Sequence, residues 1–427
     1  MRPKHLWGCL ILIALTGCGA NNAEPLSVDF VNPLTDINII LAFTCQHETI
    51  PATSAEADVL FHYARWLQKN NQLKQDKAVD AEIERLFRIA SENGHYKANI
   101  NLQNGAMRGT FKLRGEEHLR MSEQLINAGV AAGYYFVGIF LQHGAAGLQQ
   151  DHEIALRYYR KAADEGNALA QAYVADKLAP INIAPDVARQ MRRCAAEQGN
   201  GKAAVALGIN LKNKGEYQEA LEVFQMGVVA GNEGAAGWLE ESFRGPKPDN
   251  RLHYLGQQED LERADRYKKI WKILSGYSYA NPKVPEINEI LPLPPAPLPA
   301  WDGKLQWLEE RLANVPPEKP SEALINQLAK AKLLDPATGQ GLPGSPAFSQ
   351  SHLSAPNCHS GQACPVSGYW KVGWLPRHHS VDRSVARYFE QGEILPTQLV
   401  QRYQMRTWPF SDRITRHEQA VEWYLLG

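Results

Sequence analysis

The stretch ALRYYRKAADEGNALAQAYVA, residues 155–175, decides the fold of this chain. It contains the end of one helical segment, a turn at Gly166 and the start of a second helical segment. A helix that reverses direction needs a residue that accepts positive φ just past its C-terminus, and glycine does so at little steric cost. The stretch therefore predicts a helical hairpin.

The same pattern recurs at 188–208 and 220–239, with weaker copies at 89–94 and 125–129. The turn glycines, spaced 32–37 residues apart, are Gly94, Gly129, Gly166, Gly199 and Gly231. Four residues after each of them stands a small residue, in order Ala98, Gly133, Ala170, Ala203 and Ala235. A small side chain there lets the second helix pack closely on the first. Because each hairpin has a face that it cannot bury alone, the repeats predict a stacked α-solenoid over 81–245.

This repeat resembles the Sel1-like repeat, a relative of the tetratricopeptide repeat. The resemblance is clearest in GAAGLQQD (144–151), which is similar to the family's glycine-rich loop, and in the KAA run at 161–163. The loops at 176–187 and 209–216 lack that glycine signature. The resemblance implies a mostly α fold, a right-handed solenoid that serves as an interaction scaffold and not as a catalyst.

Aromatic side chains at helical spacing allow two interpretations. They form the core between repeats, or they are anchors on a binding face, where a few aromatic residues carry much of the affinity. The candidates for such anchors are Tyr134, Tyr158, Tyr159, Trp238, Trp370 and Trp374.

The first residues of the chain indicate export. Arg2 and Lys4 precede an apolar run from Leu6 to Leu15, which is too short to span a bilayer. Leu-Thr-Gly-Cys then ends at Cys18 and resembles the bacterial lipobox. The resemblance implies a signal peptide over 1–17, acyl chains such as palmitate on Cys18, and a tether over 18–35. With Gly19 after the cysteine, we expect an outer-membrane anchor that faces the periplasm.

Composition narrows the class of protein further. The formal net charge is −1, so no strong basic field is available to hold nucleic acid. Cys358 and Cys364 are six residues apart in a loop-like stretch, and we expect them to form a disulfide. Cys45 and Cys194 would then either pair over a long distance or stay buried and reduced.

The regions that flank the repeats differ from them. An amphipathic helix at 56–70 predicts N-terminal capping helices over 36–80, and a charged helix at 257–275 predicts a closing helix within 246–280. The prolines of 281–300 favour extended geometry, either as a stiff linker or docked on the solenoid. Residues 301–427 then predict a small α+β module, with helices near 305–313 and 321–334 and β character at 364–374.

This C-terminal region carries two further resemblances. The pattern Cys-Pro-x-Ser-Gly-x-Trp at 364–370, followed by Trp408, is similar to a module of bacterial toxin-immunity proteins. The proline-rich stretch with Trp301-Asp-Gly resembles a domain of unknown function found after Sel1-like repeats, over about 285–427.

The sequence predicts no catalytic residue, no metal and no cofactor. The familiar zinc-protease, phosphate-loop and nucleophile-elbow motifs do not occur. Five cysteine and histidine residues near the C-terminal end could donate to a metal, but their spacing fits no established zinc module. The favoured interpretation is a disulfide with histidines in solvent, and the alternatives are a metal site or a cysteine nucleophile. The five residues are Cys358, His359, Cys364, His378 and His379.

The resemblances imply a protein that binds a protein partner. The first hypothesis is an immunity protein that occludes a type VI secretion effector, for example a phospholipase, and touches the membrane only through its lipid anchor. The second hypothesis is an adapter in envelope biogenesis. The third is an envelope enzyme whose C-terminal module uses Cys364 and His379.

Overall fold

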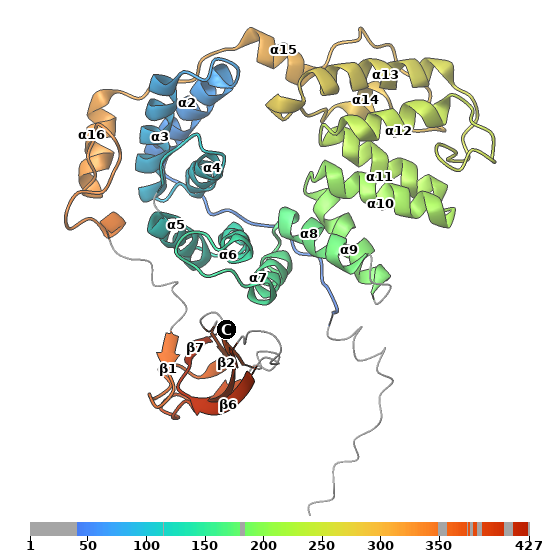
Figure 1. The fold of residues 1–427 in the computed structure, drawn as a ribbon. Coiled ribbons are helices and arrows are strands. Elements are labelled where there is room, and N and C mark those ends of the chain that lie inside the picture. Colours follow the sequence, from blue (N-terminus) through green and yellow to red (C-terminus); the bar gives the residue numbers. More distant parts are fainter. Residues whose placement is uncertain are drawn as a thin grey trace, which may run out of the picture.

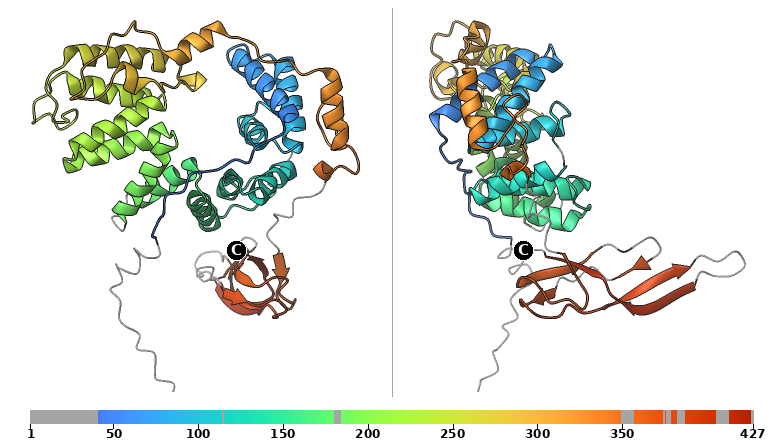
Figure 2. Two further views of the ribbon diagram at one scale, coloured as in Figure 1. Left: turned by 180° about the vertical axis from the view of Figure 1, so that it is seen from behind. Right: turned by 90° about the vertical axis from the view of Figure 1, so that its left-hand side faces the viewer.

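The computed structural model describes residues 41–113, 115–179, 184–348, 357–373, 375, 379–381, 387–404 and 413–425. Cys18, Trp374, His378 and Trp408 lie outside these residues. Helices form a ring in Figures 1 and 2, and a small β module follows at the C-terminal end. The expected mostly α architecture with helical repeats is confirmed. No helix within the described residues combines the length and the apolar character that a membrane span requires.

The ring is built from consecutive helices, each packed on the next along most of the chain. The repeat helices and their neighbours are α2 (Ala55–Asn71), α3 (Lys77–Glu92), α4 (Tyr96–Met107), α5 (Gly115–Asn127), α6 (Ala132–His143), α7 (His152–Asp164), α8 (Ala168–Leu178), α9 (Pro185–Glu197), α10 (Gly201–Lys214), α11 (Tyr217–Val229), α12 (Glu233–Phe243) and α13 (Leu261–Gly276).

The turn glycines behave as the repeat predicts, because all five have φ between 73° and 102°. After three of them an asparagine caps the next helix through its side-chain oxygen. Asn167, Asn200 and Asn232 accept hydrogen bonds from the amides of Ala170, Ala203 and Ala235 at 2.9–3.1 Å. These three alanines are the small residues noted in the repeat, and all are buried. One Gly-Asn pair therefore ends a helix, caps the next one and fixes where the small residue enters the core.

An extended segment at the N-terminal end, residues 41–53, lies along one face of the ring (Figure 2); we call it the N-terminal strap. Arg160 of α7 donates to the carbonyl of Ala42 at 2.6 Å, and Gln171 of α8 donates to the carbonyl of Gln46 at 2.9 Å. The Glu48 carboxylate accepts from the amide of Ala132 at 2.6 Å. The strap thus crosses helices that lie 80 to 150 residues further along the chain.

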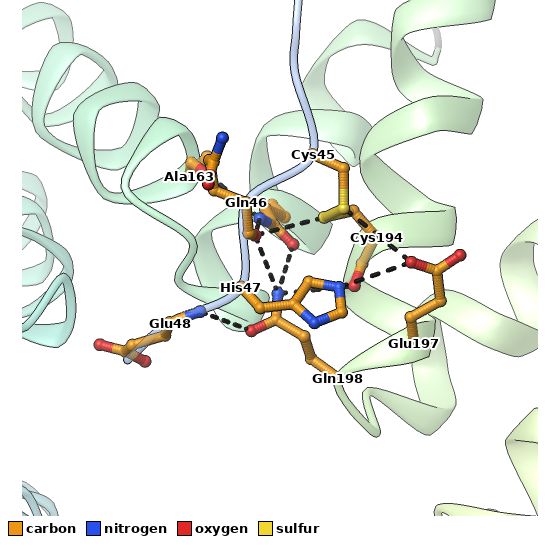
Figure 3. Close-up of a disulfide and its surroundings, with 9 residues drawn as sticks. Cys45, Gln46, His47, Glu48, Ala163, Cys194, Glu197 and Gln198 are labelled. Atoms are coloured by element: carbon orange, nitrogen blue, oxygen red, sulfur yellow. Dashed lines mark hydrogen bonds and ion pairs between the residues drawn. A yellow bond between two sulfur atoms is a disulfide. The ribbon is translucent and has the colours of Figure 1, made fainter. Parts of the chain in front are cut away.

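A disulfide joins this strap to α9. Cys45 and Cys194 are bonded, with their Cα atoms 5.6 Å apart (Figure 3). The predicted Cys358–Cys364 disulfide is wrong, since both thiols are free and buried. The Cys358 thiol donates to Gln362 Oε1 at 3.3 Å, whereas the Cys364 thiol donates to the carbonyl of Val366 at 3.0 Å. Cys358 and Cys364 are close in sequence, but no bond joins their sulfur atoms.

The proline-rich stretch is docked on the ring and is not a free linker. Val284, Ile287 and Leu291 are fully buried in one core with α11, α12 and α13. Arg263 donates to the carbonyls of Pro292 and Ala296, and Arg266 donates to those of Ile290 and Pro299. An extended run has no internal hydrogen bonds, so these two arginines satisfy carbonyls that the prolines leave unpaired.

Residues 281–348, which we call the closing segment, then return to the first helices of the ring (Figure 1). The segment contains α14 (Ile287–Ile290), α15 (Gln306–Ala313) and α16 (Glu322–Ala331). Ile325 and Leu328 of α16 share a core with α2, α3 and α4. Arg85 of α3 donates to the carbonyl of Pro336 at 2.6 Å and pairs with Glu322 at 2.7 Å. The helices near 305–313 and 321–334 therefore form as predicted, but they belong to the ring.

In the described part of the C-terminal module the strands form two antiparallel sheets, one in the order β1-β7-β2-β4 and one in the order β3-β5-β6. Trp370 and Trp423 are the largest side chains of their core. Lys371 pairs with Glu153 of α7. The strands are β1 (Asn357–His359), β2 (Gly368–Val372), β3 (His379–Ser380), β4 (Arg387–Phe389), β5 (Gln398–Gln404), β6 (Arg413–Gln419) and β7 (Glu422–Leu425).

Candidate binding surface

A pocket of about 400 Å³ lies where the closing segment meets the first helix of the ring; we call it the closure pocket. One wall is the face of α2 that carries Arg65, Trp66 and Lys69, and the opposite wall is Trp307 and Arg311 of α15. The two walls are joined through Asn314, whose side-chain amide donates to Asn70 Oδ1 at 2.8 Å. The pocket exists only because the ring is closed.

Three cations of this pocket have no carboxylate partner among the ion pairs of the described residues: Arg65, Lys69 and Arg311. Arg65 instead donates to Asn101 Oδ1 at 3.2 Å, and Arg311 donates to Gln72 Oε1 at 3.4 Å. Elsewhere on the ring, arginines pair with an acid one turn away, as in Arg160 with Asp164, or with an acid of another helix, as in Arg120 with Glu92. The closure pocket therefore carries net positive charge, because its lining has these three cations and one acid, Glu310.

The pKa of Lys69 agrees with an excess of cations in the closure pocket. Partial burial and the neighbouring Arg311 guanidinium lower the pKa of Lys69, although Glu310 acts in the opposite direction. The repulsion by Arg311 disfavours the charged ammonium, and an incoming anion would offset that repulsion. The pocket thus favours a carboxylate or another anionic group as its occupant.

Aromatic rings surround the Arg311 guanidinium. It lies 5.8 Å from the ring centroid of Tyr277, 5.6 Å from that of Tyr279 and 5.6 Å from that of Trp307. Cation–π contacts of this kind hold a guanidinium in place without neutralising it. The Tyr279 side chain remains 45% exposed. The rim of the pocket therefore combines a fixed cation with accessible aromatic surface, as binding hot spots commonly do.

A second pocket, of about 550 Å³, lies between α12 and α13. Trp238 and Trp271 line it together with His253 and Lys268. The indole of Trp238 stacks on Phe224 with ring centroids 5.4 Å apart, and the Lys212 ammonium lies 5.5 Å from its centroid. Trp238, one of the aromatic anchors predicted from the sequence, therefore lines a pocket.

The other predicted anchors have different surroundings. Tyr159 and Trp370 are 2% and 0% exposed, so they are core residues and the anchor interpretation is wrong for both. Tyr134 and Tyr158 are partly buried against the α6–α9 core, with ring centroids 6.3 Å apart. Trp374, like the lipidation candidate Cys18, lies outside the described residues. The aromatic spacing in the repeats mostly encodes packing.

Sequence reasoning missed the cations of the closure pocket, although a signal was present. Most helical arginines of this chain have an acid three or four residues away, where side chains on one helix face meet. Arg65, Lys69 and Arg311 have no acid at those positions, and Arg65 and Lys69 stand four residues from each other. A cation on a helix without such a neighbour was the available clue.

A family model described as a domain of unknown function (DUF6396) matches residues 235–343. This match confirms the expected domain of unknown function, but its range covers α12 to α16 and ends before the β module. No curated protein sequence matches the chain.

Solved structures resemble parts of the chain. A Pseudomonas aeruginosa protein, PA5086, is 25% identical over 60% of this chain and 96% of its own, with a TM-score of 0.45. The immunity protein Pa5087 from Pseudomonas aeruginosa is 23% identical with the same coverage and a TM-score of 0.46. A Sel1 repeat protein from Oxalobacter formigenes is 18% identical over 51% of this chain and 87% of its own, with a TM-score of 0.37.

Proposed function

We propose that this chain is an immunity protein that binds a type VI secretion effector and occludes it at the periplasmic face of the outer membrane. The sequence supports this proposal through its resemblance to Sel1-like immunity lipoproteins and through the lipobox at Cys18. A lipid anchor would hold the binding surface where an incoming toxin arrives and would raise its local concentration.

The observation that carries the proposal is the closure pocket with its three unpaired cations. An acidic side chain of the partner entering this pocket would form charge-assisted hydrogen bonds with Arg311 and Lys69. The aromatic rim would exclude water from these contacts and strengthen them. Complementary charge would also steer the encounter between the two proteins. The ring would then cover the part of the effector that surrounds this acidic group.

Competition between sibling strains tests the proposal. Cells that lack this chain should be killed by siblings with an active type VI secretion system, and the wild-type chain should restore survival. Pull-down from those attacked cells, with the mature chain carrying Cys18→Ser, should capture the effector. If deletion weakens the envelope without attackers and leaves survival under attack unchanged, the proposal is wrong and the adapter hypothesis replaces it.

A matched pair of variants tests the pocket itself. Lys69→Glu with Arg311→Glu should weaken binding of the captured effector at least about tenfold, which corresponds to about 1.4 kcal/mol. The control, Lys272→Glu with Lys202→Glu, makes the same change of charge outside the pocket. It should bind the effector within about twofold of wild type, because salt screens the effect of distant surface charges. Equal losses in both double variants would contradict a role for the closure pocket.

A further inference from the structure

Four metal-binding side chains meet where the N-terminal strap crosses α9. Cys45 and His47 come from the strap, and Cys194 and Glu197 come from the helix (Figure 3). Donor atoms of Cys45, His47 and Cys194 all lie within 4.8 Å of one another. Glu197 Oε2 adds a fourth donor, 3.5 Å from His47 Nε2 and 3.9 Å from Cys45 Sγ. All four side chains belong to this chain, so the cluster requires no protein partner.

The four side chains point toward one another because of the periodicity of each element. Residues two apart in an extended segment project to the same side, so Cys45 and His47 both face α9. Residues three apart in a helix lie on one face, so Cys194 and Glu197 both face the strap. Each element therefore contributes two donors to a common point. Two sulfur atoms, one imidazole and one carboxylate are ligands that Zn²⁺ takes in tetrahedral sites.

The spacing of the donors agrees with such a site. Tetrahedral zinc with its usual bond lengths places nitrogen and oxygen ligands about 3.3 Å apart, and sulfur and oxygen ligands about 3.5 Å apart. The corresponding distances here are 3.5 Å for His47 to Glu197 and 3.9 Å for Cys45 to Glu197. The two sulfur atoms, which are covalently bonded in the disulfide, would have to separate to about 3.8 Å.

We propose that reduction of the Cys45–Cys194 disulfide converts this cluster into a zinc site. A dithiol reductant supplies two electrons and two protons, so that the disulfide becomes two thiols and the reductant becomes a disulfide. Binding of Zn²⁺ then releases the two thiol protons, and the two thiolates, His47 Nε2 and a Glu197 oxygen complete the coordination. The exposure of Cys45, His47 and Glu197 gives the ion an entry path.

The proposed site keeps the strap attached to α9 in both chemical states. In the oxidised chain the link is the disulfide. In the reduced chain the link is the metal, which joins the same two residues and recruits two more. The strap would therefore stay docked where its hydrogen bonds to Gln171 and Gln198 require it.

Cobalt titration tests this proposal, because tetrahedral thiolate-bound Co²⁺ has a distinctive visible spectrum. The protein is the mature chain with Cys18→Ser, reduced with a dithiol that is then removed without oxygen. We expect one Co²⁺ per chain, displaced by Zn²⁺, and no such spectrum for the oxidised chain. His47→Ala should weaken affinity by more than the roughly 10–100-fold that loss of an outer-shell partner costs. Glu197→Gln should also weaken it, because an amide oxygen is a poorer zinc ligand.

Two features of the experiment make it decisive. His47 and Glu197 have exposed side chains, so their variants test the site without removing a core residue or the disulfide. A variant with Cys358→Ala and Cys364→Ala removes the other two thiols and should bind Co²⁺ as the wild type does. A reduced chain without the tetrahedral spectrum overturns the proposal, and so does binding that depends on Cys358 and Cys364 or ignores His47.

Discussion

The N-terminal strap and the closing segment both cross helices that are distant in the sequence, but different forces hold them. The closing segment buries Leu291 in the α11–α13 core and Ile325 in the α2–α4 core. The strap leaves most of its side chains exposed and is held by hydrogen bonds and by Cys45. Apolar burial depends little on redox state or pH, whereas a disulfide depends on redox state and a partly buried carboxylate depends on pH. The ring therefore has two fastenings: the closing segment holds in either redox state, whereas the covalent part of the strap's attachment depends on redox state.

Truncation of the closing segment's core should have the largest effect. Ile325 is 1% exposed among the side chains of α2, α3 and α4. Ile325→Ala removes buried methyl groups and leaves a cavity, so the free energy of unfolding should fall by about 2–5 kcal/mol. Denaturant unfolding followed by circular dichroism measures this loss. Gln327→Ala, an exposed change on the same helix, should stay within about 0.5 kcal/mol of wild type, and equal losses would show that α16 is not packed in that core.

Loss of the Cys45–Cys194 disulfide should have the second largest effect. Cys45→Ser removes a cross-link between residues 149 apart, and such a link typically contributes about 2–4 kcal/mol. Hydrogen exchange should show faster exchange in residues 41–50 and unchanged exchange in α16. Reduced wild type with a chelator present should match the variant. If the strap keeps its protection in the variant, its hydrogen bonds hold it without the covalent link, and the contrast between the two fastenings fails.

Structural features that depend only on residues nearby along the chain could be predicted from the sequence. Gly166 and Ala170 could be interpreted because a helix end, an asparagine cap and a helix start lie within five residues. The helix at 321–334 could be predicted from its own start signal, and it forms as Glu322–Ala331. Local rules on helix ends and periodicity are enough for these features.

The same sequence does not show what each element packs against. The role of Glu48 is decided by the amides of Ala132 and Asn167, which lie 84 and 119 residues further along the chain. Backbone and side-chain contacts with helices far along the chain hold the strap in place. The pairing of Cys45 with Cys194 follows from where the strap lies, and counting cysteines could not supply it. The closure pocket is hidden for the same reason, since Arg65 and Arg311 meet only when the ring closes.

The smallest expected effect is a pH dependence of opposite sign at the two fastenings. Burial raises the pKa of Glu48 in the strap, although its hydrogen bonds with Ala132 and Asn167 oppose the change. The Arg85 guanidinium, mainly through its hydrogen bond, lowers the pKa of Glu322 in the closing segment. Both carboxyls have an ordinary value of 4.5. The folded chain therefore binds more protons at Glu48, and fewer at Glu322, than the unfolded chain does.

The signs follow from linkage. As the pH rises above 4.5, the contribution of Glu48 to stability decreases, because the folded state must give up a proton that it holds more tightly than the unfolded state. As the pH falls below 4.5, the contribution of Glu322 decreases, because the unfolded state gains a proton more readily. Hydrogen exchange between pH 3 and 7, corrected for intrinsic exchange rates, gives the free energy of local opening. The change of this free energy with pH in the strap and in α16 measures the two contributions. Glu48→Gln should remove the decrease in the strap at higher pH, and Glu322→Gln should remove the decrease in α16 at lower pH. Two slopes of the same sign would mean that the strap and the closing segment are not held by different electrostatics.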